Sequence, residues 1–334
     1  MEAKCIKFYE FGDPQTVLKV ENKCIQKPFE GEVLVRMITR PINPSDLLPI
    51  RGAYSHRIPL PSIPGYEGVG IVEEVGPAVS KELIGKRVLP LRGEGTWQDY
   101  VKTSAELAIV IPGSIEDHIA AQLYINPITA WLICTEVLTL KPDDVLLVNA
   151  CGSSIGRILA QLSKILGFKL IAVTRNDKYT EELLKLGASY VIDTSRSSLQ
   201  DTVMELTNGR GAKAAIDSVG GIDGSELAFC VRPNGILLTI GLLSGQSVNW
   251  AEISRRTKVD VKMFHLRHWN QQASVQTWHE TFNLLMGFIA DEKLKFMTPD
   301  SYYGLQDVQE AMNVTSNKGK IFLSSLFCKG HPLN

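Results

Sequence analysis

The sequence predicts a mixed α/β protein in which a β-barrel-like domain is joined to a domain built on a doubly wound parallel sheet. Three observations favour this architecture. The chain has 334 residues, which is enough for two domains. Residues 1 to about 115 hold short β-type runs between Gly, Pro and charged turns. From about residue 120 to 265, apolar strand-like runs alternate with helical stretches, as in successive βαβ units.

The first part lacks long helical periodicity. Its expected strands include Val33–Met37, Gly70–Val75 and Arg87–Leu89, each bounded by turn residues. Such a succession of short strands indicates a barrel-like domain.

The second part begins with the apolar strand Val145–Val148, a small-residue loop and a helix that Gly167 ends. The apolar face of that helix carries Ile155, Leu159, Leu162 and Leu166. The next strand is Leu170–Val173. Three further strands are expected at Tyr190–Ile192, Ala214–Ile216 and Ile236–Ile240, with helices around Tyr179–Leu186, Leu199–Leu206 and Ser225–Val231. This alternation predicts a parallel sheet with helices on both faces.

The last part adds a helix with apolar residues from Trp278 to Ile289 and a final strand, Lys320–Leu323. Because β-rich sequence lies at both ends, we expect the C-terminal part to pack on the first domain. The predicted domains are 1–120, 121–265 and a return segment, 266–334, that completes the first. The crevice between the two domains is the expected active site.

The composition excludes several classes of protein. The net charge of −1 gives no reason to expect a nucleic-acid or anionic-membrane partner. The six cysteines form no CxxC pair and indicate reduced thiols. No apolar run reaches about 18 residues, and the N-terminus lacks a signal-peptide core. We therefore expect a cytoplasmic protein without a membrane segment.

The loop after the strand Val145–Val148 predicts a dinucleotide site. A small-residue loop between an apolar strand and a helix lets a pyrophosphate approach backbone N–H groups at the helix N-terminus. The glycine pattern is incomplete, because a full GxGxxG register would also place glycines at Cys151 and Ser153. Gly152 and Gly156 remain, so an ordinary βα turn is the alternative.

The residue that follows the second strand predicts the cofactor. In this kind of unit, a residue about 20 positions past the loop contacts the adenosine ribose. Here that residue is Arg175, and the position before it is Thr174 and not an Asp or Glu. A guanidinium favours a 2′-phosphate through charge-assisted hydrogen bonds worth roughly 1.5–3 kcal/mol each. The predicted cofactor is NADPH, and a solvated surface arginine is the alternative.

The histidines and cysteines do not predict a metal site. A catalytic zinc needs three converging ligands, and the six histidines are scattered through the chain. Without a metal, a carbonyl must be polarised or protonated by an O–H or N–H donor. Tyr54, in a Gly- and Pro-rich loop, is the nearest candidate, although a surface tyrosine is the alternative.

The chain resembles the medium-chain dehydrogenase/reductase superfamily along nearly its full length. Five motifs carry the resemblance, namely NPSD at 43–46, GYEGVGIVEEVG at 65–76, GKR at 85–87, the loop at 150–156 and GKI at 319–321. The resemblance implies a GroES-like β-barrel domain and a Rossmann domain. It is to the zinc-free branch, since Tyr66 stands where zinc alcohol dehydrogenases carry a histidine.

Two zinc-free families compete, the quinone oxidoreductases and the mitochondrial-type 2-enoyl thioester reductases. The second carries an active-site Tyr eight residues past the Asp of NPSD, which matches Asp46 and Tyr54. It also carries the Gly-Thr-Trp found at 95–97 and the Asn-Pro-x-Thr-Ala found at 126–130. The details therefore favour an enoyl reductase.

This resemblance implies that NADPH delivers hydride to the β-carbon of a trans-2-enoyl thioester and that Tyr54 donates, or orients the donor of, the α-proton. Asn126 would hold the nicotinamide ribose or the substrate, unless it only caps a helix. The residues expected to bind the cofactor are Gly152, Ser153, Ser154, Ile155, Arg175, Gly241, Phe264, Leu266 and Lys320. Lys320 would reach the phosphates, unless it is a surface lysine on an edge strand.

The nearest alternative is an NADPH-dependent quinone or alkenal reductase, and a second is a non-catalytic NADPH-binding protein. The expected partners are a small substrate (enoyl-CoA, an enoyl group on acyl carrier protein, or a quinone) and a second copy of the chain. The apolar strand Ile236–Ile240 is the expected edge at which two subunits pair their sheets, as in relatives.

Overall fold

The computed structural model describes residues 2–314 and 319–325. The chain divides into two compact units. Unit 1 comprises Met1–Ile125, Ala273–Ala290 and Phe296–Asn334, and unit 2 comprises Asn126–Gln272 and Asp291–Lys295. The boundary after residue 125 lies close to the expected one at 120, whereas residues 266–272 and 291–295 group with unit 2 and not with the return segment.

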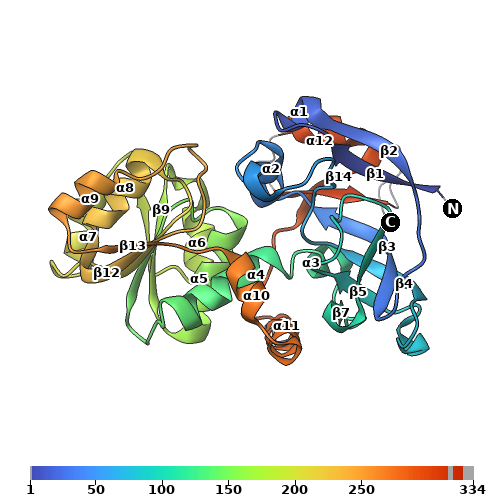
Figure 1. Cartoon of the computed structure of the whole chain (residues 1–334). Helices are drawn as coiled ribbons and strands as arrows, with labels where there is room; N and C mark the ends of the chain where they lie inside the picture. The colour runs from blue at the N-terminus through green and yellow to red at the C-terminus, as the bar shows by residue number, and fades with distance from the viewer. Residues whose placement is uncertain (1, 315–318, 326–334) are drawn as a thin grey trace. The chain divides into compact units, whose positions relative to one another are not determined.

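Unit 1 is built on a seven-stranded sheet with the order β14-β15-β3-β4-β5-β7, in which β6 also pairs with β3 (Figure 1). The seven strands are β3 (Glu32–Pro41), β4 (Val69–Val75), β5 (Arg87–Pro90), β6 (Tyr100–Ser104), β7 (Ala108–Val110), β14 (Pro299–Tyr303) and β15 (Lys320–Ser324). Strands β1 (Glu2–Phe8) and β2 (Leu18–Cys24) form a separate antiparallel pair. The three strands predicted in this part are confirmed.

The helices of unit 1 are short apart from one. They are α1 (Pro14–Val17), α2 (Pro44–Ile50), α3 (Asp117–Ala120), α11 (Val275–Ala290) and α12 (Val308–Asn313), with single 3₁₀ turns η1 (Ser55–Arg57), η2 (Lys81–Leu83), η3 (Ala105–Leu107) and η6 (Leu305–Asp307). The long helix α11 buries Trp278, Phe282 and Leu285, as its apolar spacing predicts. A core cluster that includes Ile6, Phe8, Ile50, Trp97 and Leu323 unites β1, α2 and β15.

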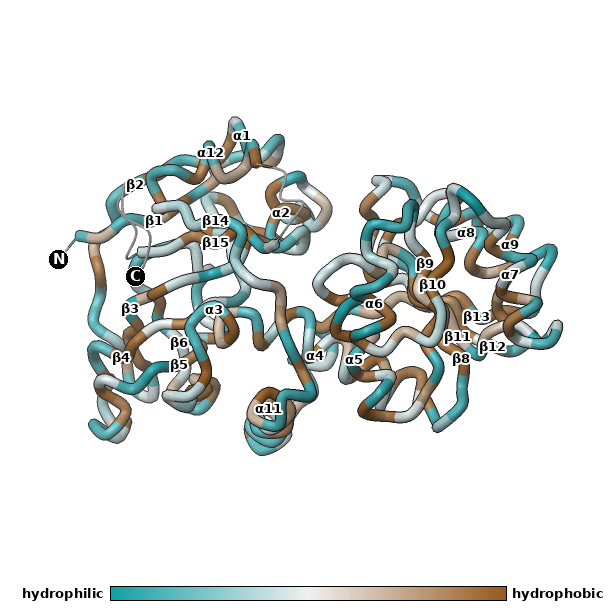
Figure 2. Tube along the Cα trace, turned by 180° about the vertical axis from the view of Figure 1, so that it is seen from behind, coloured by the Kyte–Doolittle hydropathy of each residue, from teal (hydrophilic) through white to brown (hydrophobic). Residues whose placement is uncertain are grey.

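Unit 2 holds a six-stranded parallel sheet with the order β10-β9-β8-β11-β12-β13. Its strands are β8 (Val145–Val148), β9 (Lys169–Thr174), β10 (Tyr190–Asp193), β11 (Ala212–Asp217), β12 (Val231–Thr239) and β13 (Asp260–Met263). Numbered within this unit, the order is 3-2-1-4-5-6, the dinucleotide-binding topology. Figure 2 shows apolar sequence along these strands, which suits a sheet buried on both faces.

Helices cover both faces of this sheet, as a doubly wound fold requires (Figure 1). One face carries α5 (Ser154–Leu166) and α6 (Thr180–Leu186), which η5 (Asp177–Tyr179) precedes. The other carries α7 (Leu199–Leu206), α8 (Gly221–Phe229) and α9 (Trp250–Arg256). The unit also contains α4 (Ile125–Leu132), its π-helical continuation η4 (Ile133–Val137) and α10 (Leu266–Gln272).

One expectation about the sheet is wrong. Strand β12, which contains most of the predicted strand Ile236–Ile240, lies between β11 and β13 and is not an edge. The edge strands are β10 and β13, and β13 is a short segment that the sequence pattern does not single out. Helix α8 also begins at Gly221, four residues before the expected Ser225.

Candidate active site

The loop after β8 makes a tight turn into α5. Ala150 has a positive φ of 47°, and Ser153 caps the helix by accepting a hydrogen bond from Gly156 N at 3.3 Å. A Cβ atom at Gly156 would lie 2.3 Å from the carbonyl oxygen of Cys151, so only glycine fits this close packing. The first-turn N–H groups of α5 therefore sit at the carboxyl end of β8, where an anion is favoured.

An aromatic and cationic cluster lies against this loop. A Cβ atom at Gly152 would come within 2.5 Å of the Tyr179 ring. Arg157 donates from Nε to the Gly152 carbonyl at 2.9 Å, lies 5.2 Å from the centre of the Tyr179 ring and pairs with Glu182. The Lys178 ammonium lies 5.0 Å from the same ring. Positive charge beside an open helix N-terminus suits the phosphates of a dinucleotide.

The other residues expected to bind a cofactor follow the carboxyl ends of neighbouring strands. Arg175 comes directly after β9, is exposed and makes no hydrogen bond or ion pair with the residues that the structure describes. Gly241 follows β12, and a side chain there would meet the Ser218 carbonyl at 2.8 Å. Phe264 follows β13, where its N–H donates to Thr239 O at 3.0 Å, and Leu266 begins α10.

All the expected cofactor residues except Lys320 thus lie at one edge of the unit 2 sheet. Parallel strands bring their carboxyl ends to a common edge, and ligands bind there where the strand order reverses. In this sheet the reversal lies between β8 and β11.

A buried pair at this reversal was missed by sequence reasoning. Asn149, which follows β8, donates from Nδ2 to Asp217 Oδ1 at 2.7 Å, and its Oδ1 accepts from Ser218 N at 2.8 Å. Asp217 also accepts from the N–H groups of Val219 and Gly220 at 2.9 Å each. This network fixes the loops after β8 and β11 relative to each other, and the apolar pattern that located both strands contains no sign of it.

Tyr54 lies in unit 1, between α2 and η1. The core anchors the segment on both sides, because Ile50 is fully buried and Ile58 packs against the same cluster. The Arg57 guanidinium lies over the Tyr54 ring, 4.0 Å from its centre. The half-buried phenol is therefore held on a rigid loop.

A buried polar cluster lies beneath this loop, at the start of α2. Asn43 donates from its backbone N–H to Asp46 Oδ2 at 2.8 Å and from Nδ2 to Glu67 Oε1 at 2.7 Å. Glu67 Oε2 accepts from the N–H groups of Tyr124 and Ile125 at 3.3 and 2.8 Å. Lys320 donates from Nζ to Asn43 Oδ1 at 2.5 Å. We call Asn43, Asp46, Glu67 and Lys320 the buried cluster.

Burial dominates the electrostatics of this cluster, whose four residues are at most 6% exposed. Loss of hydration raises the pKa of Asp46 to about 7, with the Glu67 charge adding to the shift. Burial also raises the pKa of Glu67, against the pull of Lys320, and lowers the pKa of Lys320. The lysine is the cation that balances two buried carboxyl groups.

Lys320 is therefore not a surface lysine. Its ammonium donates to Asn43 within the buried cluster of unit 1, and the expected contact with the cofactor phosphates stays a prediction. Burial follows from the pairing of β15 with β3, where Ile42 N donates to Ile321 O at 2.9 Å.

Two further residues from the sequence analysis have defined positions. Tyr66 donates its backbone N–H to Asp46 Oδ1 at 3.1 Å, and the residue is 44% exposed. Asn126 lies within the first turn of α4, which begins at Ile125, so it is not the cap of that helix. Its half-buried side chain makes no hydrogen bond with any described residue.

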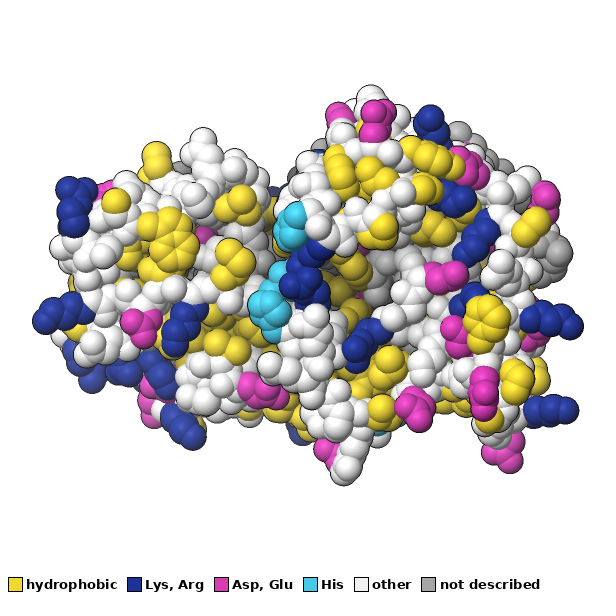
Figure 3. All heavy atoms as spheres, in the orientation of Figure 1, with side chains coloured by type: hydrophobic (Ala, Val, Ile, Leu, Met, Phe, Trp, Pro, Cys, Tyr) yellow, Lys and Arg dark blue, Asp and Glu magenta, His cyan; other side chains and the backbone are white. Residues whose placement is uncertain are grey.

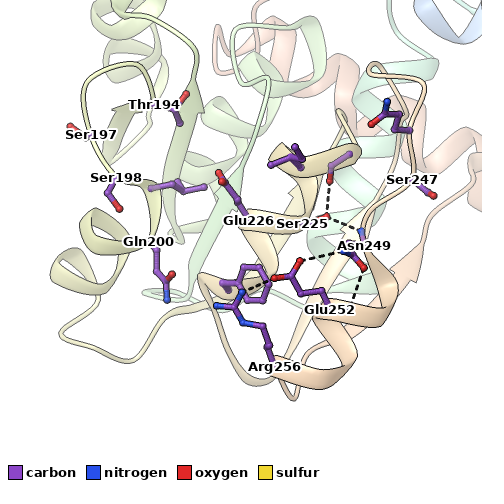
Figure 4. A pocket seen from close by; sticks show the side chains of 15 residues that line it. Thr194, Ser197, Ser198, Gln200, Ser225, Glu226, Ser247, Asn249, Glu252 and Arg256 are labelled. Atoms are coloured by element: carbon purple, nitrogen blue, oxygen red, sulfur yellow. Dashed lines mark hydrogen bonds and ion pairs between the residues drawn. The ribbon is translucent and has the colours of Figure 1, made fainter.

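A cavity lies elsewhere in unit 2, between the loop after β10 and helices α8 and α9 (Figure 4). It has a volume of about 730 Å³, and polar residues such as Ser225, Asn249 and Glu252 line it. It shares no residue with the expected cofactor set. The cavity therefore adds nothing to the predicted dinucleotide edge.

Within residues 2–314 and 319–325, no group of three or more His, Cys, Asp or Glu side chains could hold a metal ion. No helix of the same residues is long and apolar enough to cross a membrane. Five cysteines are free thiols, and Cys328 lies outside the described residues.

Comparison with known proteins assigns the chain to a family. The family model for the alcohol dehydrogenase GroES-like domain matches residues 29–113, and that for zinc-binding dehydrogenases matches residues 154–287. The mitochondrial enoyl-[acyl-carrier-protein] reductase of Rattus norvegicus is 32% identical over 321 residues, which cover 93% of this chain and 85% of the relative. The chain belongs to the medium-chain dehydrogenase/reductase superfamily. The expected fold class, a GroES-like domain with a Rossmann domain, is confirmed.

Solved structures extend the relationship within this superfamily of oxidoreductases. A proposed NADPH:quinone reductase from Bacillus thuringiensis is 64% identical, with a TM-score of 0.95 over 97% of this chain and 99% of that one. The Escherichia coli quinone oxidoreductase, solved with NADPH, is 26% identical with a TM-score of 0.86, over 96% of this chain and 99% of that one. The relatives are thus enoyl reductases and quinone oxidoreductases, the two families to which the sequence motifs point.

Proposed function

We propose that the protein catalyses the NADPH-dependent reduction of an α,β-unsaturated carbonyl compound, with a trans-2-enoyl thioester as substrate. The observation that carries the proposal is the convergence of the expected cofactor residues at the carboxyl edge of a 3-2-1-4-5-6 parallel sheet. The curated relatives of enoyl reductase function, at 30–32% identity over most of the chain, support the choice of reaction.

The proposed cofactor site fits NADPH. The N-terminus of α5, with Ser153, Ser154 and Ile155 at its start, would hold the pyrophosphate. Arg175 would bind the 2′-phosphate, since its exposed guanidinium lies directly after β9. Gly241, Phe264 and Leu266, after β12 and β13, would border the nicotinamide end.

When bound, NADPH supplies the hydride that reduces the β-carbon of the substrate. Negative charge then develops on the carbonyl oxygen and the α-carbon, and a neutral O–H donor stabilises it without a metal. In the proposed mechanism Tyr54 is that donor, or orients it, and Asn126 holds the ribose or the substrate. No metal takes part in this mechanism.

A second candidate function is the reduction of quinones or alkenals with the same cofactor. The 64% identity to the proposed quinone reductase of Bacillus thuringiensis favours it. The two candidates share the fold and the hydride donor, and they differ in whether the substrate carries an acyl chain on a thioester.

NADPH oxidation with crotonyl and decenoyl thioesters and with a quinone, at matched concentrations, separates these candidates. The proposal expects the thioesters to have the higher kcat/KM. It expects Tyr54→Phe to lose about 10²- to 10⁴-fold in turnover with NADPH affinity changed less than about twofold. A protein that binds NADPH but turns over no substrate would be the non-catalytic alternative, and turnover retained by Tyr54→Phe would remove the phenol from the mechanism.

We also propose that the protein forms a homodimer in the cytoplasm. The edge strand β13 ends at Met263, which is 73% exposed, and Leu243 and Ile222 of the same unit are 58% and 76% exposed. Figure 3 shows hydrophobic side chains on the surface of this unit. Pairing of two β13 strands would cover an open sheet edge, so Met263→Glu should shift a dimer toward monomer on a sizing column.

A further inference from the structure

Arg157 connects the two segments of unit 2 that are expected to hold the cofactor. Its Nε donates to the Gly152 carbonyl, in the loop after β8, at 2.9 Å. Its guanidinium carbon lies 5.2 Å from the centre of the Tyr179 ring, beyond β9, and its Nη1 pairs with Glu182 of α6. The Arg157 side chain is only 13% exposed, so it is a packed and paired arginine and not a solvated surface charge.

The Tyr179 ring lies directly against the loop after β8. A Cβ atom added to Gly152 would lie 2.5 Å from Cδ2 and 2.8 Å from Cε2 of this ring, so a larger residue there would displace the ring. Gly152 is one of the two glycines that remain in the incomplete dinucleotide motif. Its packing on Tyr179 gives a reason for this glycine besides the approach of a pyrophosphate.

The segment between β9 and Tyr179 is short and is fixed at both ends. Strand β9 ends at Thr174, so only residues 175–178 separate the strand from Tyr179. At the strand end, the Thr174 hydroxyl donates to the Asn176 carbonyl at 2.9 Å. At the other end, the Tyr179 ring packs on the loop after β8. The position of Arg175 therefore depends on where this ring is held.

The loop after β8 also has contacts that do not involve Arg157. Ser153 donates its N–H to Ala150 O at 2.9 Å, and its hydroxyl accepts from Gly156 N at 3.3 Å. The close packing of Gly156 on Cys151 holds the same turn. Loss of Arg157 should therefore disturb the segment after β9 more than the pyrophosphate site at the start of α5.

We propose that Arg157, acting through the Tyr179 ring, positions the segment that distinguishes NADPH from NADH. Arg157 is a positioning residue, and the proposal requires no contact between it and the 2′-phosphate. A planar guanidinium can donate to a carbonyl, pair with a carboxylate and lie against a ring at the same time, whereas a lysine ammonium is a point charge. The inference rests on the proposed cofactor site, in which Arg175 binds the 2′-phosphate.

The test measures the dissociation constants of NADPH and NADH for the full chain by fluorescence titration, without substrate. The wild type should bind NADPH about tenfold more tightly than NADH or better, because only NADPH offers a 2′-phosphate to a charge-assisted contact. Arg157→Gln should reduce this ratio about threefold or more. The affinity for NADH should change less than about twofold, since the pyrophosphate site keeps its own contacts.

Three further variants separate positioning from charge. Arg157→Lys keeps the charge and should lose the preference for NADPH as Arg157→Gln does. Tyr179→Ala should lose the preference as well, whereas Tyr179→Phe, which keeps the ring, should retain it. Arg256→Gln is the matched control, because Arg256 also pairs with a glutamate, Glu252, at 2.6 Å and lies 4.3 Å from the centre of the Phe229 ring. This variant should keep the wild-type ratio.

Four results would overturn the inference while leaving the cofactor site standing. An unchanged ratio in Arg157→Gln would remove Arg157 from nucleotide selectivity, and an equal loss of affinity for both nucleotides would make it a general support of the phosphate loop. A ratio retained by Arg157→Lys would assign its effect to charge alone. A ratio lost in Tyr179→Phe would assign selectivity to the tyrosine hydroxyl. A wild type without a preference for NADPH would instead overturn the proposed role of Arg175, and the inference with it.

Discussion

Replacing Lys320 with methionine should destabilise the protein by about 3–5 kcal/mol, the range found when one partner of a buried ion pair is removed. Methionine preserves most of the side-chain volume, so the loss isolates the charge. Lys320 is 6% exposed, and without it Asp46 and Glu67 would share a dry site with no cation.

The geometry favours the lower end of this range. Glu67 would keep three donors, from Asn43, Ile125 and Tyr124, at 2.7, 2.8 and 3.3 Å. Protonation of Asp46 or Glu67 would also reduce the loss of stability, because burial already raises the pKa of both carboxyl groups. A loss of about 3 kcal/mol near neutral pH is therefore the central expectation.

Urea unfolding followed by circular dichroism measures this change, with each unit's transition analysed separately where two are resolved. The double variant Lys320→Met/Glu67→Gln should recover stability relative to Lys320→Met alone, since it removes one uncompensated charge. Lys185→Met is the control, because that lysine is 81% exposed in an ion pair of 3.9 Å and should matter by less than about 0.5 kcal/mol. A loss below about 1 kcal/mol for Lys320→Met, or no recovery in the double variant, would refute the argument for charge balance.

Three other outcomes are expected. The folded state holds the Asp46 proton more tightly than the unfolded state, so the contribution of Asp46 to the free energy of unfolding should be greatest below pH 4 and should be lost as pH rises toward 7. Asp46→Asn should therefore flatten the dependence of stability on pH between these values. An unchanged pH dependence would exclude Asp46 as its source. Arg175→Asp should cost about 10-fold or more in kcat/KM for NADPH and invert the preference toward NADH. If kcat/KM stays higher with NADPH than with NADH, Lys178 or Tyr179 becomes the next residue to replace. Gly156→Ala should weaken NADPH binding measured by fluorescence titration and lower stability, because the new Cβ would meet the Cys151 backbone, whereas Gly113→Ala, which meets nothing within 4 Å, should change neither.

The nucleotide unit was predictable because its determinants are local. Buried parallel strands are continuous apolar runs, and Val145–Val148 was located to the residue. The residues expected to bind the cofactor follow such strands directly, so locating the strands also located the residues. The edge strand of the unit 2 sheet was misassigned because the order of strands in a sheet cannot be read from any one segment. Strand β13 was also missed, because its sequence Asp-Val-Lys-Met has the charge pattern of an exposed loop.

The buried cluster of unit 1 shows the opposite case. A lysine at the start of a strand is usually solvated, and its sequence neighbours give no reason to expect otherwise. Its partner Asn43 lies 277 positions earlier in the chain, and only the pairing of β15 with β3 brings the two together. The NPSD segment that precedes Tyr54 is thus stabilised by a residue from the C-terminal part of the chain. Because the same segment leads through α2 into the loop that carries Tyr54, the position of the phenol depends on a contact that no local pattern encodes, and Lys320→Met should affect turnover as well as stability.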